Sequence, residues 1–293
     1  MRYAKPITEV IKQRYSCRTY LDKPIDEEKR QQLAGFAASR TVGTFGTPTR
    51  FQLVAATEED QTALRGLETY GFISGATGFV LGAVRDAPKN MEDLGYLLED
   101  IVLFATGLGL GTCWLGGTFN RSAFAAKMPL RAGESLPAVI AVGYIADKPS
   151  VMESMVRRAA GSDHRLPWEQ IAFDAAFGVP LPRDKAGAYA EPLEMLRLAP
   201  SASNKQPWRA IRDGAAWHFY LQRSPGYGNA RFARLHIADL QRVDMGIAMR
   251  HFELTAREAA LLGKWVLNEP PLGKPDPLTE YVATWVSETR EGA

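Results

Sequence analysis

Two arginines and a serine alternate near the start of the chain, in the segment RYSCR at 14–18. Arginine offers a planar fork of donors that suits a phosphate, and a serine hydroxyl adds another donor. In an extended chain Arg14, Ser16 and Arg18 point the same way, and a helix that ends near Tyr15 would also let them converge. This arrangement can hold a phosphate. The alternative is that the arginines satisfy the carbonyl groups and dipole of a helix end, which is the commoner case for such a pentapeptide alone.

A second polar segment is APSASNKQPW at 199–208. Short hydroxyl and amide side chains on a loop framed by two prolines present donors and acceptors at set positions, which suits a polar heterocycle or a polyol. An ordinary polar turn before a strand has a similar composition. The side chains in question belong to Ser201, Ser203, Asn204 and Gln206.

A third segment, GLGLGTCWLGG at 107–117, is rich in glycine. Glycines after a helix bring bare backbone amides close to a flat ligand. The alternative is a helix C-cap with tight packing. A dinucleotide-binding fingerprint is excluded, because the third glycine is missing and the segment follows a helical pattern instead of a strand.

The elements that must position these segments follow from hydrophobic periodicity. Helices are predicted at 6–15, from Ile25 onward, and at 58–67, 91–108, 192–198 and 234–262. Strands are predicted at 51–56, 136–145, 208–211 and 216–221, and a connector at 149–182. Helices and strands mix without a strict βαβ alternation, which predicts an α+β fold.

The chain also carries a weak internal repeat. NKQPWRAI at 204–211 aligns with TPTRFQLV at 47–54, an offset of 157 residues, and LLGKW at 261–265 aligns with LGTCW at 110–114, an offset of 151. In each half a polar loop precedes a short strand, and a long helix runs into a turn with glycine and tryptophan. Chance similarity is the alternative, because identity is low. A true duplication would make the chain a covalent pseudo-dimer.

Composition limits the function classes. The chain has 293 residues, 46% of them hydrophobic and 23% charged, with a net charge of +2. These values do not indicate a nucleic-acid partner or a membrane surface, so an anion site must be local. Two cysteines, Cys17 and Cys113, are no disulfide framework, and with no signal-peptide pattern at the start we expect a cytoplasmic protein. The uncharged stretch 101–119 is interpreted as a buried helix followed by a glycine turn, since it holds five glycines. The four histidines show no metal-ligand spacing.

In their order along the chain, these motifs resemble the nitroreductase-like flavoprotein family. The resemblance rests on RYSCR, on the helix into GLGLGTCWLGG, on the strand AVIAVGYI with its arginine-bearing tail to RLP, and on PSASNKQPW. It covers most of the chain, and GTCWLGG and PSxxNxQPW are fairly specific. Members usually carry one set of motifs in a half-length chain and dimerise, with FMN at the interface. The resemblance implies a three-layer α/β/α sandwich in a double-length, single-chain form. Residues 1–165 would be one half and 166–293 a degenerate second half.

The resemblance also implies roles for individual residues. The FMN phosphate and ribityl end would be held by Arg14, Ser16, Arg18 and Arg165. The backbone N–H groups near flavin N5 and O4 would come from Leu115, Gly116 and Gly117. The side chains that reach toward the isoalloxazine from the second half would be Ser201, Ser203, Asn204 and Gln206. Asp163 and His164 depart from the lysine that the family often has before Arg165. Trp114 is expected to pack, and Cys17 and Cys113 to be bystanders.

The expected function is FMN-dependent oxidoreduction. Hydride would pass from NADH or NADPH to flavin N5 and then to an electron-poor acceptor such as a nitroaromatic, a quinone or a flavin, with no catalytic side chain and no metal. We expect one FMN per chain, a small-molecule substrate, a monomer with an internal pseudo-dimer, and no nucleic-acid or membrane partner. One alternative is a flavin-binding sensor or storage protein without turnover; another is a non-flavin α+β domain with chance motifs.

Overall fold

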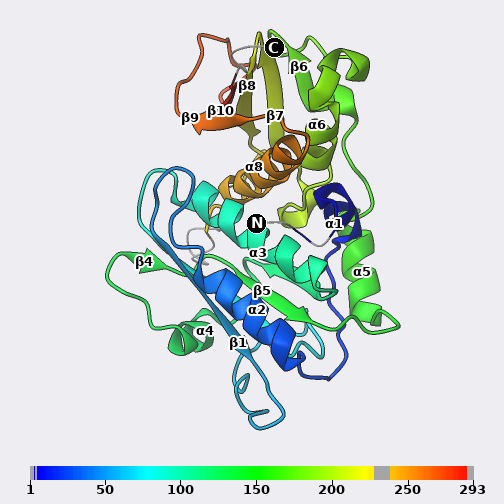
Figure 1. The fold of residues 1–293 in the computed structure, drawn as a ribbon, viewed down its shortest axis with the longest axis vertical. Helices are drawn as coiled ribbons and strands as arrows, with labels where there is room; N and C mark the ends of the chain where they lie inside the picture. Colours follow the sequence, from blue (N-terminus) through cyan, green and yellow to red (C-terminus); the bar gives the residue numbers. More distant parts are fainter. Residues whose placement is uncertain (1–2, 4, 228–237, 289–293) are drawn as a thin grey trace.

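The computed structural model describes residue 3, residues 5–227 and residues 238–288. This part of the chain forms two five-stranded sheets with helices between and around them (Figure 1). The α+β prediction is therefore confirmed. None of the helices in these ranges combines the length and the apolar character that a membrane crossing needs.

The first sheet is antiparallel throughout. Its order is β1 (Thr49–Ala55), β2 (Gly78–Arg85), β5 (Val139–Gly143) and β3 (Gly111–Leu115), with β4 (Glu134–Ser135) paired to β2. Successive side chains of a strand point to opposite faces. Val80 and Val84 of β2 accordingly join the core cluster on the side of α2 (Glu27–Ala38) and α3 (Asn90–Gly107). Phe79 and Leu81 join the cluster that includes Phe124 of α4 (Arg121–Lys127). Helices thus cover both faces.

The second sheet has the order β6 (Ala172–Asp174), β7 (Trp208–Asp213), β8 (Ala216–Gln222), β10 (Thr279–Ser287) and β9 (Gly263–Val266). Only the β6–β7 pair is parallel within this sheet. Trp217, Phe219 and Leu221 of β8 belong to the same core cluster as α6 (Ala190–Arg197) and α8 (Leu240–Glu258). The described ranges also contain the helices α1 (Ile7–Gln13) and α5 (Val151–Ala160) and the 3-10 turns η1 (Trp168–Gln170), η2 (Arg183–Tyr189) and η3 (Ala202–Asn204).

Four strands of each sheet follow one plan. The order β1-β2-β5-β3 matches β7-β8-β10-β9, and all three pairings in each set are antiparallel. In each set a long helix, α3 or α8, lies between the second strand and the edge strand along the chain. This repetition supports the internal duplication that the weak sequence repeat indicates. A boundary between residues 165 and 166 stays a prediction.

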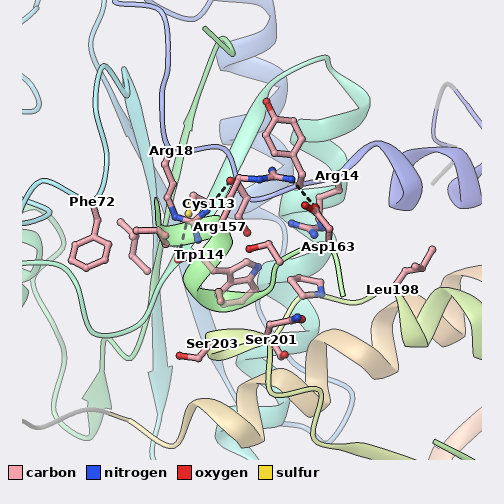
Figure 2. Close-up of a pocket in the computed structure, with 18 of the residues that line it drawn as sticks. Arg14, Arg18, Phe72, Cys113, Trp114, Arg157, Asp163, Leu198, Ser201 and Ser203 are labelled. Carbon is pink, nitrogen blue, oxygen red and sulfur yellow. Dashed lines mark hydrogen bonds and ion pairs between the residues drawn. The ribbon is translucent and has the colours of Figure 1, made fainter. Parts of the chain in front are cut away.

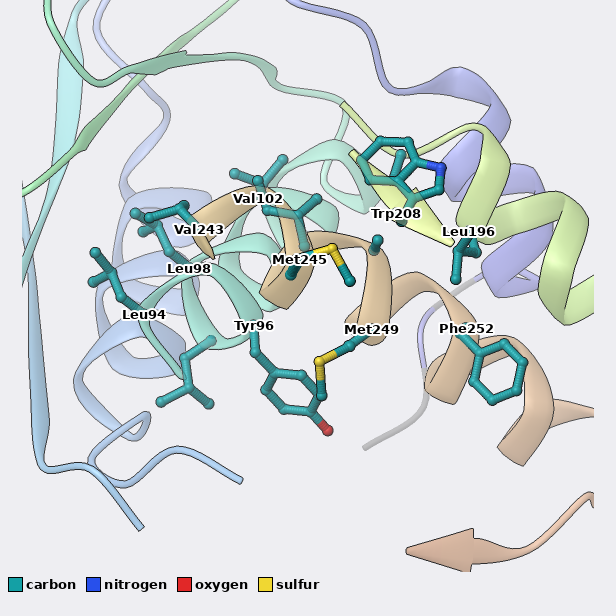
Figure 3. Packing of buried hydrophobic residues seen from close by; sticks show 14 of the residues in the cluster. Leu94, Tyr96, Leu98, Val102, Leu196, Trp208, Val243, Met245, Met249 and Phe252 are labelled. Atoms are coloured by element: carbon teal, nitrogen blue, oxygen red, sulfur yellow. The ribbon is translucent and has the colours of Figure 1, made fainter. Parts of the chain in front are cut away.

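The helices α3 and α8 pack against each other between the two sheets (Figure 1). A Cβ on Gly95 would clash with the carbonyl oxygen of Val243, and a Cβ on Gly246 would clash with that of Glu92. The two contacts are equivalent by the repeat. Gly246 lies 151 residues after Gly95, and Val243 lies 151 residues after Glu92, which is the offset of the LGTCW repeat. Figure 3 shows side chains of both helices, among them Leu94 and Val243, in one buried cluster.

Buried polar and charged side chains also join these helices, with acidic residues mostly on α3 and basic residues on α8. Glu99 Oε1 lies 2.8 Å from His251 Nε2, and Asp100 Oδ1 lies 2.8 Å from Arg250 Nη2. Near the first turns of the helices, Glu92 Oε2 accepts a hydrogen bond from Arg242 at 2.6 Å. Because burial removes water, each partner depends on the other to offset its desolvation.

The first helix joins the N-terminal segment to the second half. Val10 and Ile11 of α1 pack with Leu103 of α3 and Met195 of α6. The N-terminal N–H of α1, on Ile7, donates to the Glu258 carboxylate at 2.9 Å. A carboxylate at a helix N-terminus satisfies an otherwise free donor and complements the helix dipole.

Two element predictions are wrong. Residues 58–67 form turns instead of a helix. Thr57 Oγ1 accepts from the Asp60 N–H and Asp60 Oδ1 accepts from the Thr62 N–H, both at 2.9 Å, and such local side-chain bonds compete with helix formation. The connector at 149–182 contains α5, whose N-cap Ser150 accepts from the Glu153 N–H at 3.1 Å.

The other predicted elements are present with shifted ends. The helix at 91–108 is α3, the helix at 192–198 is α6, and the strand at 136–145 is β5. The helical stretch at 234–262 contains α8, which begins at Leu240, and its part at 234–237 lies outside the described residues. The glycine segment is partly a strand, because 111–115 forms β3, while Gly109 adopts a φ of +79° after α3 as a C-cap does.

The crossing of α3 and α8 can be tested with Gly95→Ala. The added methyl group meets a backbone carbonyl that cannot rotate away, so we expect a loss of about 1–3 kcal/mol in the free energy of unfolding, measured by urea denaturation. Gly35→Ala is the matched control, since Gly35 lies on α2 with open space where a Cβ would be. That variant should gain up to about 1 kcal/mol from helix propensity. Equal stability of the Gly95→Ala variant and the original chain would contradict the close crossing.

Candidate functional site

A cavity of about 470 Å³ lies where the two halves meet. Its volume falls within the roughly 300–1,000 Å³ range of small-molecule sites. Its wall comes from four stretches, at 12–18, 113–118, 156–165 and 198–204, with Phe72 in addition. Figure 2 shows Arg14, Arg18, Trp114, Ser201 and Ser203 among the side chains that line it.

The RYSCR segment is extended and presents alternate residues to the cavity. The helix α1 ends at Gln13, because Arg14 already has φ −64° and ψ 128°. The Cys17 N–H donates to the Thr112 carbonyl at 2.9 Å, which aligns the segment beside β3. Arg14, Ser16 and Arg18 line the cavity, whereas Cys17 is 1% exposed and belongs to the core. The predicted convergence of the three side chains is therefore present.

The helix α5 fixes the far end of this segment. The buried Glu153 accepts from the Arg18 N–H at 3.1 Å and from Thr19 Oγ1 at 2.8 Å. The Glu153 carboxylate is therefore bonded to the segment itself and not to the Arg18 guanidinium. Arg18 Nη1 donates instead to the Ser16 carbonyl at 3.1 Å. The Arg18 side chain is thus oriented by a carbonyl group, and no carboxylate of the described residues forms an ion pair with it.

Two arginine side chains at the cavity keep donors free. The Nε atoms of Arg14 and Arg165 are among the buried side-chain nitrogen and oxygen atoms of the described residues that have no hydrogen-bond partner. Burial lowers the pKa of the Arg14 guanidinium, and burial followed by repulsion from Arg14 lowers the pKa of Arg165. Desolvated, mutually repelling cations with free donors are stabilised by an anion.

A further cation of the cavity, Arg157, is paired with a carboxylate. Arg157 Nη2 lies 2.7 Å from Asp163 Oδ1. Arg165 uses Nη1 to bond the Ser162 carbonyl at 2.8 Å and Asn204 Oδ1 at 3.3 Å, so the loop of the second half touches the arginine of the first. The anion-binding capacity is therefore concentrated at the Nε sides of Arg14 and Arg165.

The loop at 201–206 crosses from the second half under local strain. Ser203, Asn204 and Gln206 have φ values of 50°, 53° and 50°, which non-glycine residues seldom adopt. Strain of this kind persists where the surroundings hold it, and it is concentrated at functional sites. The Asn204 amide donates to the Gly161 carbonyl at 2.7 Å, and Gln206 Oε1 accepts from the Leu166 N–H at 2.8 Å.

A smaller cavity of about 130 Å³ adjoins the first. The two share Ser16, Arg18, Trp114, Pro200, Ser201 and Ser203. The small cavity is further lined by Gly116 and by Leu240, Val243, Asp244 and Ile247 of α8. A Cβ on Gly116 would lie 2.6 Å from Leu240 Cδ1, so a side chain at this position would have to displace the Leu240 side chain of α8.

Trp114 forms part of the wall of both cavities. Its Nε1 donates to Glu99 Oε2 at 2.8 Å, and the other oxygen of Glu99 faces His251. His251 Nδ1 in turn lies 3.0 Å from the Met195 carbonyl. A chain of buried hydrogen bonds therefore joins the indole to α3, α8 and α6, and holds its orientation.

The structure brings most of the predicted site residues together. Those that line the large cavity are Arg14, Ser16, Arg18, Leu115, Arg165, Ser201, Ser203 and Asn204. Gly116 lines the small cavity, and Gly117 lines neither of the two. Gln206 is 3% exposed and does not line them either, since its side chain bonds the backbone at Leu166.

Sequence reasoning missed Asp244 and the apolar residues of α8. Asp244 follows the α3 residue Asp93 by 151 residues, and the triplets Asp-Leu-Gly at 93–95 and Asp-Met-Gly at 244–246 share two letters. Comparing the residues upstream of LLGKW with those upstream of LGTCW, at the same offset of 151 residues, would have found this match. Cys113, expected to be a bystander, lines the large cavity, but burial raises the pKa of its thiol to about 11.

Comparison with protein families identifies the chain. A family model described as "Putative TM nitroreductase" matches residues 6–256. The chain belongs to this nitroreductase family. A search of curated protein sequences gave no match.

A solved structure shows the same fold. A crystal structure described as a putative nitroreductase from Thermotoga maritima has a TM-score of 0.60 at 18% identity, over 98% of this chain and 95% of that one. It supports the predicted nitroreductase-like fold. A structure from Desulfovibrio desulfuricans, described as a putative nitroreductase in complex with FMN, has a TM-score of 0.43 at 23% identity, over 61% of this chain and 99% of that one.

Proposed function

We propose that this nitroreductase-family protein is an FMN-dependent oxidoreductase with one flavin site per chain. The observation that carries the proposal is the pair of buried, unpartnered Nε atoms of Arg14 and Arg165, in a cavity that also receives the Ser16 hydroxyl and the polar loop of the second half. These donors fit a phosphate, and the loop fits a polar ring system.

The chain's own residues would bind and orient the cofactor. Arg14, Ser16, Arg18 and Arg165 would hold its phosphate and ribityl end, and Ser201, Ser203 and Asn204 would contact it from the second half. Gly116 follows β3 directly and lines the small cavity, so its N–H would serve the flavin edge, whereas Gly117 lines neither cavity and would contribute only if its N–H reaches the flavin from behind. Gln206 would act through the loop that it ties to Leu166.

When bound, FMN would supply hydride transfer at N5 between NADH or NADPH and an electron-poor acceptor such as a nitroaromatic, a quinone or a flavin. The protein's part is to exclude water and fix geometry. Trp114, held by Glu99, and the apolar α8 side chains Leu240, Val243 and Ile247 line the small cavity. Such a wall leaves space for a flat, weakly polar group.

In the second half, the position equivalent to Trp114 is occupied by Trp265, and other side chains pack around it. Trp265, which lies 151 residues after Trp114, has ring centroids of Phe219 and Trp285 at 4.9 Å and 5.2 Å. Its Nε1 donates to Glu253 at 2.7 Å. This packing supports a single cofactor site, and a chain that pairs its halves internally would need no second copy to build that site.

Stoichiometry tests the single site. Apoprotein titrated with FMN, followed by quenching of flavin fluorescence, should saturate at one FMN per chain. Two equal sites would contradict the proposal, because Phe219, Trp285 and Glu253 already contact Trp265, the counterpart of Trp114.

The phosphate assignment is tested by the double variant Arg14→Ala, Ser16→Ala. Removing a charge-assisted contact costs about 1.5–3 kcal/mol, so we expect FMN affinity to fall at least tenfold and the purified protein to lose its yellow colour. Arg212→Ala is the control, because Arg212 is paired with Asp174 and lines neither cavity. Full flavin occupancy in the double variant would show that the phosphate lies elsewhere.

Turnover is tested by mixing the FMN-loaded protein with NADH or NADPH under nitrogen. Loss of the flavin absorbance band, followed by its return when a quinone or nitroaromatic is added, is the expected result. A flavin band that stays unchanged with both nicotinamides would contradict the oxidoreductase and favour a flavin-binding sensor or storage protein.

A further inference from the structure

Asp93 and Asp244 anchor equivalent loops in the two halves. Asp244 accepts a hydrogen bond from the Ala202 N–H at 3.0 Å on Oδ1 and 3.1 Å on Oδ2. Asp93 Oδ1 accepts from the Phe45 N–H at 2.9 Å, and Asp93 Oδ2 accepts from the Thr47 N–H at 3.0 Å. The aspartates are 151 residues apart and Phe45 and Ala202 are 157 apart, the two offsets of the sequence repeat.

The two loops differ in what they face. Ser201, Ala202 and Ser203 line the cavities, and Asp244 itself lines the smaller one. Neither Asp93 nor its loop residues Phe45 and Thr47 line either cavity. The chain therefore contains the same anchor twice, once at the candidate flavin site and once away from it.

The anchor at the site is tightly constrained. Asp244 is 3% exposed, and burial raises its pKa well above the usual range, with repulsion from Asp239 adding to the effect. It holds Ala202 at the start of η3, directly before the left-handed residues Ser203 and Asn204. A strained loop needs a fixed point, because without one it relaxes to commoner backbone angles.

We propose that Asp244 is a positioning residue for the flavin: its bond to the Ala202 N–H holds the 201–204 loop in the strained form that presents Ser201, Ser203 and Asn204 to the cofactor. This inference rests on the proposed FMN function. In this role Asp244 does not contact the reacting atoms. The carboxylate is needed only as a hydrogen-bond acceptor, so the amide oxygen of an asparagine at the same position can replace it.

The test compares FMN dissociation constants, measured by fluorescence quenching at a temperature at which circular dichroism shows every variant to be folded. Asp244→Ala removes the acceptor, and we expect FMN binding to weaken roughly 10- to 100-fold, because the N–H of Ala202 loses its partner and the loop loses its anchor. Asp244→Asn keeps an acceptor oxygen and should stay within about threefold of the original chain, a difference well below the tenfold that corresponds to 1.4 kcal/mol.

Asp93→Ala is the matched control, since it removes the equivalent anchor in the other half. It should destabilise the protein without changing the FMN dissociation constant. If Asp93→Ala weakens FMN binding as much as Asp244→Ala does, the effect is general destabilisation and the positioning role is wrong.

A second variant removes the same bond from the donor side. Ala202→Pro deletes the N–H at the first position of η3, where proline is tolerated, and Ser201 before it has φ −145° and ψ 157°, which a following proline allows. It should weaken FMN binding as Asp244→Ala does, and the double variant should be no weaker than either single one. This variant also keeps the test decisive if Asp244→Ala does not fold.

The outcomes separate this inference from the proposed function. Unchanged FMN affinity in Asp244→Ala or in Ala202→Pro, with normal binding by the original chain, overturns the positioning role and leaves the FMN function standing. Absence of FMN binding by the original chain overturns both.

Discussion

Gly95 and Gly246 let the backbones of α3 and α8 approach so closely that a methyl group on either residue would clash with a carbonyl of the other helix. Each sheet packs on one of these helices, so their crossing sets how the two halves face each other. The cavity is built from stretches of both halves, at 12–18 and 198–204 among others. Its shape therefore depends on a helix crossing at two glycines that take no part in its wall.

The same crossing explains the buried charges. Arg250 and His251 follow Glu99 and Asp100 by 151 residues, and the observed pairs are crossed, Glu99 with His251 and Asp100 with Arg250. If both halves carried the acidic version, like charges would face each other without water, which is strongly unfavourable. A single chain permits different residues at the two equivalent positions, and here one copy is acidic and the other basic. Divergence of the halves thus stabilises their own interface.

The sequence predicted the features that depend on local pattern. Alternation in RYSCR indicated that Arg14, Ser16 and Arg18 would converge, and apolar periodicity located α3 and α6. Local pattern failed where side chains compete for the backbone. The bonds of Thr57 and Asp60 replace a helix with turns, and the Ser150 cap starts a helix inside the expected connector.

The part of the site that could not be predicted depends on contacts across the chain. Nothing in the short match between 93–95 and 244–246 says that these aspartates bond the loops at Phe45 and Ala202. Gln206 is the opposite case. Its motif indicated a contact with the ligand, but its side-chain amide bonds the backbone of Leu166 instead. Only the fold shows which polar side chain faces the cavity and which supports the loop behind it.

The docking of α1 has a consequence for the order of assembly. Its first N–H bonds Glu258 at the end of α8, and its apolar side packs on α6, although RYSCR directly follows it in the sequence. The helix α1 must therefore wait until the chain has been synthesised as far as Glu258 before it can reach its final place. Contacts between such distant residues form slowly, because a long loop must close first. We expect the arginine end of the cavity to be the last part of this protein to mature.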